Sequence, residues 1–408
     1  MAHIFGECDI IALPIRGASA SMARLNITRM KAILALEDGT IFAGTAFGAT
    51  GTTTGEICFH TAMTGYQEVI SDPTHCGQIL IMAYPQIGNY GINEDDNESE
   101  KLSLSALVVE EHAELFSNWR AEESLNDWLV RHGVPGIEGI DTRKLSRIMR
   151  TQGTMRACVS TELSEEEAVA EAKASAPLAG SELVSKVTTA APYHWEGESR
   201  VWKLPNKSTG NLSNYFELSP ATRTVVVYDL GVKRSILRSL RQDGFDVTVV
   251  PASTPAETVL GMAPDAVILS NGPGDPSTLT ALQAEIAKLQ GKLPIFGIAL
   301  GAQVLGIVLG GSTEQLPDGH HGGNQPIKDL RTGKMLVGSE NVTFTIKEGS
   351  LSADVEITHK NLNDGAISGF RHKSLPIAGV QFIPSATASA EGTAPAFAEL
   401  IAMINQTK

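Results

Sequence analysis

The stretch PIFGIALGAQVLGIVLGG, residues 294–311, decides the fold of the C-terminal half of this 408-residue chain. It reads as a short apolar strand, a sharp turn between Gly297 and Gly301, and an apolar helix. This order predicts a nucleophile elbow, a turn that holds one side chain up at the start of a helix. The helix dipole at such a turn depresses the pKa of a thiol. The residue at the apex is Ala299, whose methyl group cannot attack a substrate.

Upstream of this stretch, apolar strands alternate with helices. Strands are predicted at 224–230, 246–250 and 265–270, with a basic helix at 233–241 and a further helix at 278–289. Such alternation predicts a parallel sheet covered on both faces, with ligand sites at the carboxyl ends of its strands. The sequence SNGPGDP (270–276) follows the third strand, and its glycines allow a ligand to approach the backbone closely.

The N-terminal half reads as a second, strand-rich α/β domain. Asp38-Gly39 indicates a hairpin, and the Gly/Thr-rich segment 48–56 is interpreted as a turn. Helical periodicity appears at 122–132, 141–150 and 165–174, the last opened by a capping box. Residues 181–222 are polar and irregular. We therefore divide the chain into an unstructured extension (1–30), a first domain (31–180), a linker (181–222) and a second domain (223–408).

Composition narrows the functional classes. The 32 Lys and Arg against 46 Asp and Glu give a net charge of −14, and this argues against nucleic acid and anionic membranes as partners. Four cysteines do not make a disulfide framework in a chain of this length, and no apolar run approaches a membrane span. We expect a soluble, cytoplasmic protein with no metal site, because the grouping of Asp72, His75, Cys76 and Glu68 fits no common ligand spacing.

Strings along most of the chain, roughly residues 31–405, resemble those of a known family. They include TAMTGYQEVISDP and GIDTRKLSRIMR in the first half, and VYDLGVKRSILR, SNGPGDP, GHHGGNQPIKDL and THKNLNDG in the second. In this order they resemble the small subunits of carbamoyl phosphate synthetase, whose C-terminal domain is a class I glutamine amidotransferase. The resemblance implies an N-terminal small-subunit domain followed by a parallel-sheet amidotransferase domain.

The resemblance also implies a function. Such subunits use a Cys-His-Glu triad to release ammonia from glutamine, through a thioester that backbone N–H groups stabilise. The ammonia passes to a large subunit, which makes carbamoyl phosphate from bicarbonate for arginine and pyrimidine biosynthesis. ATP and magnesium would bind that large subunit, so no cofactor is expected in this chain.

The chain departs from the family where the chemistry occurs. The family's elbow reads Gly-Ile-Cys-Leu-Gly-His-Gln, so Ala299 stands at the nucleophile and Ala302 at the following His. The family's terminal His-Pro-Glu is Ile383-Pro384-Ser385, which replaces the base by Ile383 and its orienting carboxylate by Ser385. No catalytic residue of the triad is intact, and we expect no glutamine hydrolysis.

Other positions still match the family's glutamine pocket. Thr343 departs from it, because the family has a glycine at this position and a β-branched side chain intrudes on the pocket. We expect these residues to form a vestigial pocket that serves folding more than glutamine binding: Thr74, Gly272, Gly274, Leu300, Gln303, Asn341, Thr343 and Phe344.

Three interpretations stay open at this point. The chain is a glutaminase-dead small subunit that docks on a large subunit and supports an ammonia-dependent complex. Alternatively, it is a stand-alone binding or regulatory pseudoenzyme, or an engineered inactive form of a normal glutaminase subunit. Co-purification with a large subunit separates the first interpretation from the second.

Overall fold

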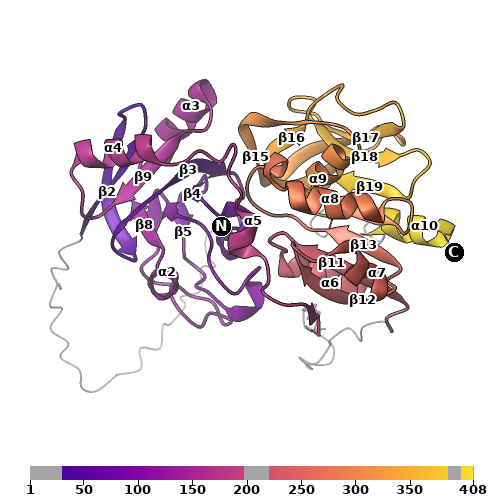
Figure 1. Ribbon diagram of the computed structural model, residues 1–408. Coiled ribbons are helices and arrows are strands. Elements are labelled where there is room, and N and C mark those ends of the chain that lie inside the picture. The colour runs from indigo at the N-terminus through magenta and orange to yellow at the C-terminus, as the bar shows by residue number, and fades with distance from the viewer. Residues whose placement is uncertain (1–29, 197–219, 385–396, 408) are drawn as a thin grey trace, which may run out of the picture.

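The computed structural model describes residues 30–196, 220–384 and 397–407. Figure 1 shows two domains side by side, with the short helix α5 (Val184–Val187) between them. Almost all of the expected N-terminal extension lies outside the described residues, as does Ser385. No helix within the described part is long and apolar enough to cross a membrane.

The N-terminal domain is built on a closed barrel of seven strands in the order β1-β2-β8-β6-β4-β3-β9. The strands β3, β4, β6 and β8 pair in parallel, and the other pairs are antiparallel. The barrel strands are β1 (Lys31–Leu36), β2 (Ile41–Gly48), β3 (Thr52–His60), β4 (Gln78–Met82), β6 (Ala106–Val108), β8 (Pro135–Glu138) and β9 (Arg156–Ser160).

Side chains alternate between two apolar clusters on either side of the barrel wall. On β4, Ile79 and Ile81 enter one cluster, with helix α3 (Thr142–Gln152). Leu80 and Met82 enter the other, with helices α1 (Tyr66–Ile70) and α2 (Leu125–His132). The two-residue period of a strand explains why β4 is apolar from Ile79 to Met82, since both of its faces are covered.

The C-terminal domain contains a ten-stranded sheet in the order β10-β12-β11-β13-β14-β19-β18-β17-β15-β16. Five adjacent strands of this sheet, in the order β12-β11-β13-β14-β19, run parallel, as the sequence predicts. They are β11 (Arg223–Asp229), β12 (Phe245–Pro251), β13 (Ala266–Leu269), β14 (Ile295–Ile298) and β19 (Ile377–Val380). The antiparallel extension consists of β15 (Thr313–Asp329), β16 (Met335–Ile346), β17 (Val355–Asn361) and β18 (Ile367–His372).

Helices cover both faces of this sheet. Apolar residues of α6 (Arg234–Gln242) and α10 (Ala398–Thr407) pack in one cluster. Those of α7 (Ala256–Gly261), α8 (Thr280–Leu289) and α9 (Leu300–Val308) pack in the other. The C-terminal half is therefore the covered α/β sheet that its alternating pattern predicts.

Some expectations from sequence hold and others need correction. Helix α4 (Glu165–Ala174) begins at the predicted capping box of Ser164 and Glu167. Most of the predicted turn at 48–56 is instead strand β3, because its threonines are β-branched and favour extended backbone. Within the expected linker, α5 and the edge strand β10 (Tyr193–His194) are ordered parts of the fold.

The close packing around Gly301 gives a test of this fold. A Cβ atom at Gly301 would lie 2.2 Å from the carbonyl oxygen of Leu269 on β13. We expect Gly301→Ala to lower the free energy of unfolding by about 3 kcal/mol or more, measured by urea denaturation. Gly261→Ala is the matched control, because a Cβ there meets no heavy atom within 4 Å. Equal stability of the two variants would contradict this packing.

Candidate functional site

The predicted elbow is present, with Ala299 at its apex. Ala299 lies between β14 and α9 with φ 50° and ψ −112°, one of two non-glycine residues with positive φ in the described part. Its N–H donates to the carbonyl oxygen of Val380 (2.8 Å). Glycines let the chain turn here, since a Cβ at Gly297 would lie 2.6 Å from the backbone nitrogen of Ala302. The strained turn of an elbow is therefore present, with a methyl group at its apex.

The position expected for the base is also apolar. Ile383 is 3% exposed and shares an apolar cluster with Ala299. Its N–H donates to the carbonyl oxygen of Ser339 (2.8 Å). Neither Ala299 nor Ile383 can carry a proton, so this region cannot support acid–base chemistry through either side chain.

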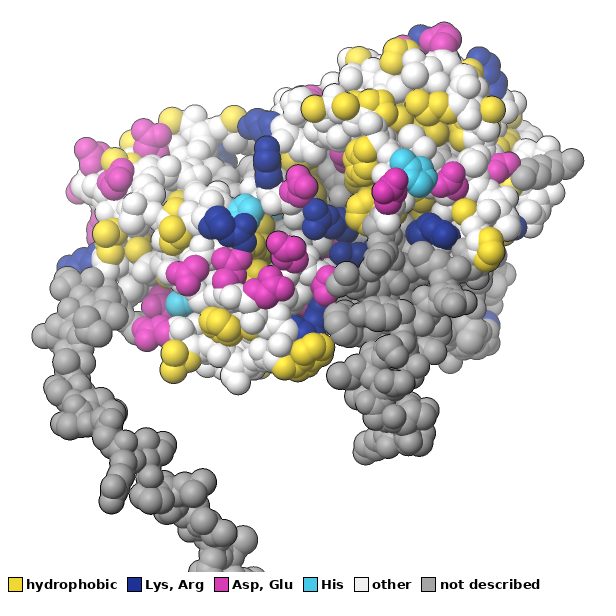
Figure 2. Space-filling model, turned by 90° about the horizontal axis from the view of Figure 1, so that it is seen from below, with side chains coloured by type: hydrophobic (Ala, Val, Ile, Leu, Met, Phe, Trp, Pro, Cys, Tyr) yellow, Lys and Arg dark blue, Asp and Glu magenta, His cyan; other side chains and the backbone are white. Residues whose placement is uncertain are grey.

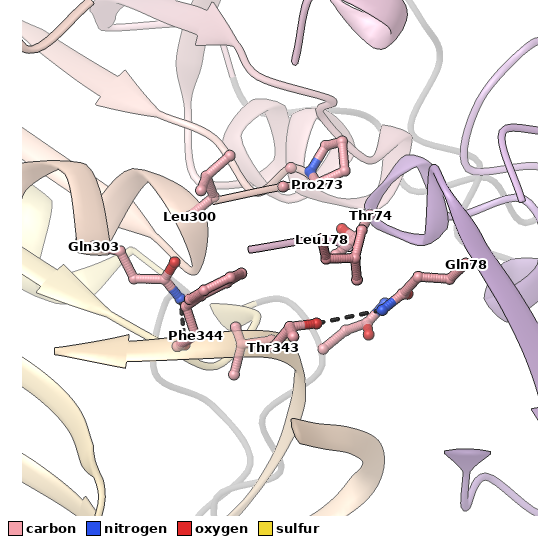
Figure 3. Close-up of a pocket in the computed structure, with 12 residues that line it drawn as sticks. Thr74, Gln78, Leu178, Pro273, Leu300, Gln303, Thr343 and Phe344 are labelled. Carbon is pink, nitrogen blue, oxygen red and sulfur yellow. Dashed lines mark hydrogen bonds between the residues drawn. The ribbon is translucent and has the colours of Figure 1, made fainter. Parts of the chain in front are cut away.

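All eight residues predicted for the vestigial pocket line one cavity. The cavity lies between the two domains and has a volume of about 20 Å³, enough for one water molecule. Four further residues complete its wall: Gln78, Leu178, Pro273 and Val342. Figure 3 shows Thr343 and Gln78 facing each other across it, and Gln78 Nε2 donates to Thr343 Oγ1 (3.3 Å). A cavity of this size has no room for an amino acid.

The polar groups of the pocket bind one another. Gln303 Nε2 donates to the carbonyl oxygen of Phe344 (2.7 Å) and to Gln381 Oε1 (3.0 Å). Thr74, in the short 3-10 helix η1 (Pro73–His75), accepts at Oγ1 from Asn271 Nδ2 (3.0 Å). These groups are already satisfied within the protein, so a ligand would have to compete with existing hydrogen bonds.

Asn341 connects the two domains through a buried network. Its Oδ1 lies 2.6 Å from His321 Nδ1, and its Nδ2 donates to Asp72 Oδ2 (3.0 Å) and to His75 Nε2 (3.1 Å). His75 Nδ1 lies 2.9 Å from Gln78 Oε1. This pattern assigns a proton to Nδ1 of each histidine. His75 is neutral because its Nε2 accepts from Asn341, and burial favours the neutral form of His321.

Lys233 is a buried cation at the contact between the two domains. Its Nζ lies 3.5 Å from Asp72 Oδ2 and 3.5 Å from Glu98 Oε1, both in the N-terminal domain. Burial alone would lower the pKa of Lys233, but Glu98 and Asp72 raise it above its usual value. Burial alone would raise the pKa of Asp72, yet Lys233 is the main cause that lowers it to about 2. Glu98 Oε2 also accepts from the N–H of Ser235 (2.8 Å) in the first turn of α6.

The network includes the buried histidines His75 and His321, and a third buried histidine, His60, lies beside it. His60 and His75 lie with ring centroids 6.1 Å apart, and His75 and His321 lie 6.3 Å apart. Burial lowers the pKa of all three, well below the usual value for His60 and to about 3 for His321. Within the described residues, no group of three or more His, Cys, Asp or Glu side chains is arranged to hold a metal ion.

Sequence reasoning missed the residues that join the domains. Asp72 was considered only as a weak metal ligand, and Gln78 and Lys233 carried no local signal. The residues that these side chains bind lie far away along the chain; Asp72, for example, binds Asn341. No rule based on sequence spacing could have paired them.

Comparison with known proteins gives a consistent result across the chain. Residues 34–159 match the family described as carbamoyl-phosphate synthase small chain, CPSase domain, and residues 226–403 match glutamine amidotransferase class-I. The chain is 50% identical over 357 residues to the carbamoyl phosphate synthase small chain of Akkermansia muciniphila, covering 88% of this chain and 93% of that protein. It is 47% identical to the small chain of Nitratidesulfovibrio vulgaris, covering 92% and 99% of the two chains.

The buried histidines predict how stability depends on pH. A histidine whose pKa in the folded protein lies below its unfolded value of about 6.5 binds more protons when unfolded, so stability falls as the pH falls below that value. Each histidine that stays neutral, as His321 does with a pKa of about 3, should lower the free energy of unfolding by about 2 kcal/mol between pH 7.5 and pH 5.

Urea denaturation across this pH range measures the loss. His321→Asn should reduce it by about the share of one histidine, whereas His372→Asn, on β18 and outside the network, should not. A wild-type stability that is flat from pH 7.5 to 5 would contradict the neutral network.

Proposed function

The chain belongs to the carbamoyl-phosphate synthase small chain family, and from this premise we propose that it is a small subunit whose glutaminase site is inactive. It acts as the scaffold of a cytoplasmic complex in which a large subunit makes carbamoyl phosphate from free ammonia. The product would serve arginine and pyrimidine biosynthesis.

The observation that carries this proposal is Ala299 at the apex of the elbow. A glutamyl thioester requires a thiolate, and the strained turn presents only a methyl group. The described cysteines all lie in the N-terminal domain and are buried. Burial raises the pKa of Cys76, raises that of Cys158 to about 11, and raises that of Cys58 well above its usual value, so none of them is a ready nucleophile.

The closed pocket supports the same conclusion from substrate binding. The cavity holds about one water molecule, and Thr343 and Gln78 bridge it from opposite domains. Glutamine could enter only if this bridge broke and the walls moved apart. The scaffold remains well packed around the pocket, as expected of a subunit retained for its fold and its docking surface.

Activity measurements test the missing chemistry. The purified chain, alone or with its large subunit, should release no ammonia from glutamine above background, while ammonium-driven carbamoyl phosphate synthesis by the complex proceeds. Glutamine hydrolysis by the unmodified chain would overturn the proposal; if thiol reagents did not block it, a serine-based site would be indicated.

Stepwise repair tests the identity of the lost triad. Ala299→Cys alone should remain inactive, because the thiol lacks a base. Adding Ile383→His and Ser385→Glu supplies a proton carrier and its orienting carboxylate, and we expect weak turnover at least roughly a thousandfold above the single variant. Ala302→Cys in place of Ala299→Cys is the matched control, since it puts a buried thiol on the same helix away from the apex. Full activity from Ala299→Cys alone would show that Ile383 and Ser385 are not the missing partners.

Removing the bulk of Thr343 should reopen the pocket of the repaired enzyme. Thr343→Gly, added to the triple variant, should lower KM for glutamine more than it raises kcat, because it relieves a binding clash. Thr343→Val keeps the volume and removes only the hydroxyl that meets Gln78, so it should leave KM high. Equal KM values for the two variants would show that side-chain volume at this position does not exclude glutamine.

A further inference from the structure

His320 binds a carboxylate at each nitrogen of its ring. Nδ1 lies 2.8 Å from Glu340 Oε2, and Nε2 lies 2.9 Å from Asp364 Oδ2. An ionised carboxylate can only accept hydrogen bonds, so both nitrogens carry a proton and the ring is charged. Figure 2 shows histidines beside acidic side chains on the surface seen from below. Contact with one carboxylate, as between His194 and Asp246, does not require a charged ring, but contact with two does.

The two carboxylates come from different parts of the sheet. Glu340 lies on β16, which pairs with the strand β15 that carries His320, whereas Asp364 lies in the turn between β17 and β18. The side chain of Glu340 is fully buried and also accepts from Ser368 Oγ (2.8 Å) and Asn361 Nδ2 (3.0 Å). An ionised carboxylate accepts all of these bonds without a proton of its own, so the proton belongs to His320.

Loss of this proton would leave one donor nitrogen between two acceptors, because a neutral imidazole has one N–H and one lone pair. Glu340 is 0% exposed, and leaving a buried carboxylate without a donor is costly, so the N–H stays at Nδ1. The lone pair of Nε2 then faces Asp364, whose side chain is 41% exposed and can be hydrated instead. The contact between His320 and Asp364 is therefore the one that breaks.

Asp364 holds the tip of the turn between β17 and β18. Its Oδ1 accepts from the N–H of Ala366 (2.9 Å), which ties the carboxylate to the backbone of the turn. The start of the turn is held separately, since the N–H of Leu362 donates to the carbonyl oxygen of Pro326 (2.8 Å). Release of Asp364 would free the tip of the turn and leave the paired strands in place.

His320 and Asp364 both line a hollow of about 460 Å³ between the two domains. The other titratable groups in its wall are Arg150 of α3, and Asp318 and His321 of β15. Burial alone would lower the pKa of His320, but Glu340 and Asp364 raise it above its usual value. The charge of the ring is thus set by the two carboxylates that bind it.

We propose that His320, Glu340 and Asp364 form a proton-dependent latch. While His320 is protonated, it fastens the turn between β17 and β18 to β15; when the proton passes to water, Asp364 is released and the tip of the turn opens beside the hollow between the domains. The three latch residues belong to the C-terminal domain, so the latch needs no partner subunit.

The latch responds to pH in the opposite sense to the buried neutral histidines. A histidine whose pKa is raised in the folded protein stabilises the fold fully below its unfolded value of about 6.5, and this contribution is lost as the pH rises through the folded pKa. The latch is therefore closed in acid and opens toward alkaline pH. The contribution of His60, His75 and His321 is instead lost as the pH falls.

Proton NMR of the histidine Cε1–H signals of the full chain tests the charge of His320. His320→Gln identifies the signal by removing it. We expect this signal to titrate above about pH 6.5, and Asp364→Asn to lower its midpoint, because one of the two carboxylates is gone. Asp354→Asn is the matched control: Asp354 is exposed and precedes the opposite end of β17, so the midpoint should not change. An unchanged midpoint in Asp364→Asn would contradict the latch.

Hydrogen exchange of residues 361–366 tests whether the turn is released. After correction for the intrinsic pH dependence of amide exchange, protection in the wild type should fall as the pH rises through the midpoint of His320. This change should disappear in Asp364→Asn, because the uncharged amide can donate to the unprotonated ring, and also in His320→Gln. Protection that does not depend on pH in the wild type would overturn the proposal, as would an equal pH dependence in the Asp364→Asn variant.

Discussion

The ammonium group of Lys233, buried between Asp72 and Glu98, holds the two domains together. A charge removed from water is costly unless opposite charges and hydrogen bonds compensate for it, and here the compensation comes from the other domain. Glu98 extends the joint by accepting from the first turn of α6, where the helix dipole favours an anion. Either domain alone would leave these charges without their partners, so the buried charges favour one relative arrangement of the two domains.

The contacts between the two domains also position the walls of the pocket. Asp72 binds Lys233 and Asn341 on one side and accepts from the N–H of Thr74 on the other (2.9 Å). The walls of the pocket are thus positioned by a residue that does not line it. This arrangement explains why the cavity is small: the network orients Gln78 through His75, and Gln78 in turn binds Thr343 across the cavity.

Local patterns predicted the parts of the structure that depend on neighbouring residues. The glycines around Ala299 indicated a strained turn, and Ser164 with Glu167 indicated the start of α4; both are present. The first part of β3, residues 52–56, was misread because glycine and threonine together resemble a turn, although the threonines pair along β9. The strands β15 to β18 and the network of Asp72, His75 and His321 could not be derived, since long-range pairing and buried polar contacts leave no period in the sequence.

The backbone of Ala299 has a consequence for how such a protein changes over time. A non-glycine residue at φ 50° and ψ −112° costs of order 1–3 kcal/mol, a cost that catalysis normally justifies. Here the surrounding glycines and the close contact of Gly301 with β13 enforce the turn although its apex carries only a methyl group. Glycine at this position would relieve the steric strain of the backbone, because it has no Cβ atom. Substitution toward glycine is the direction that folding stability alone would favour.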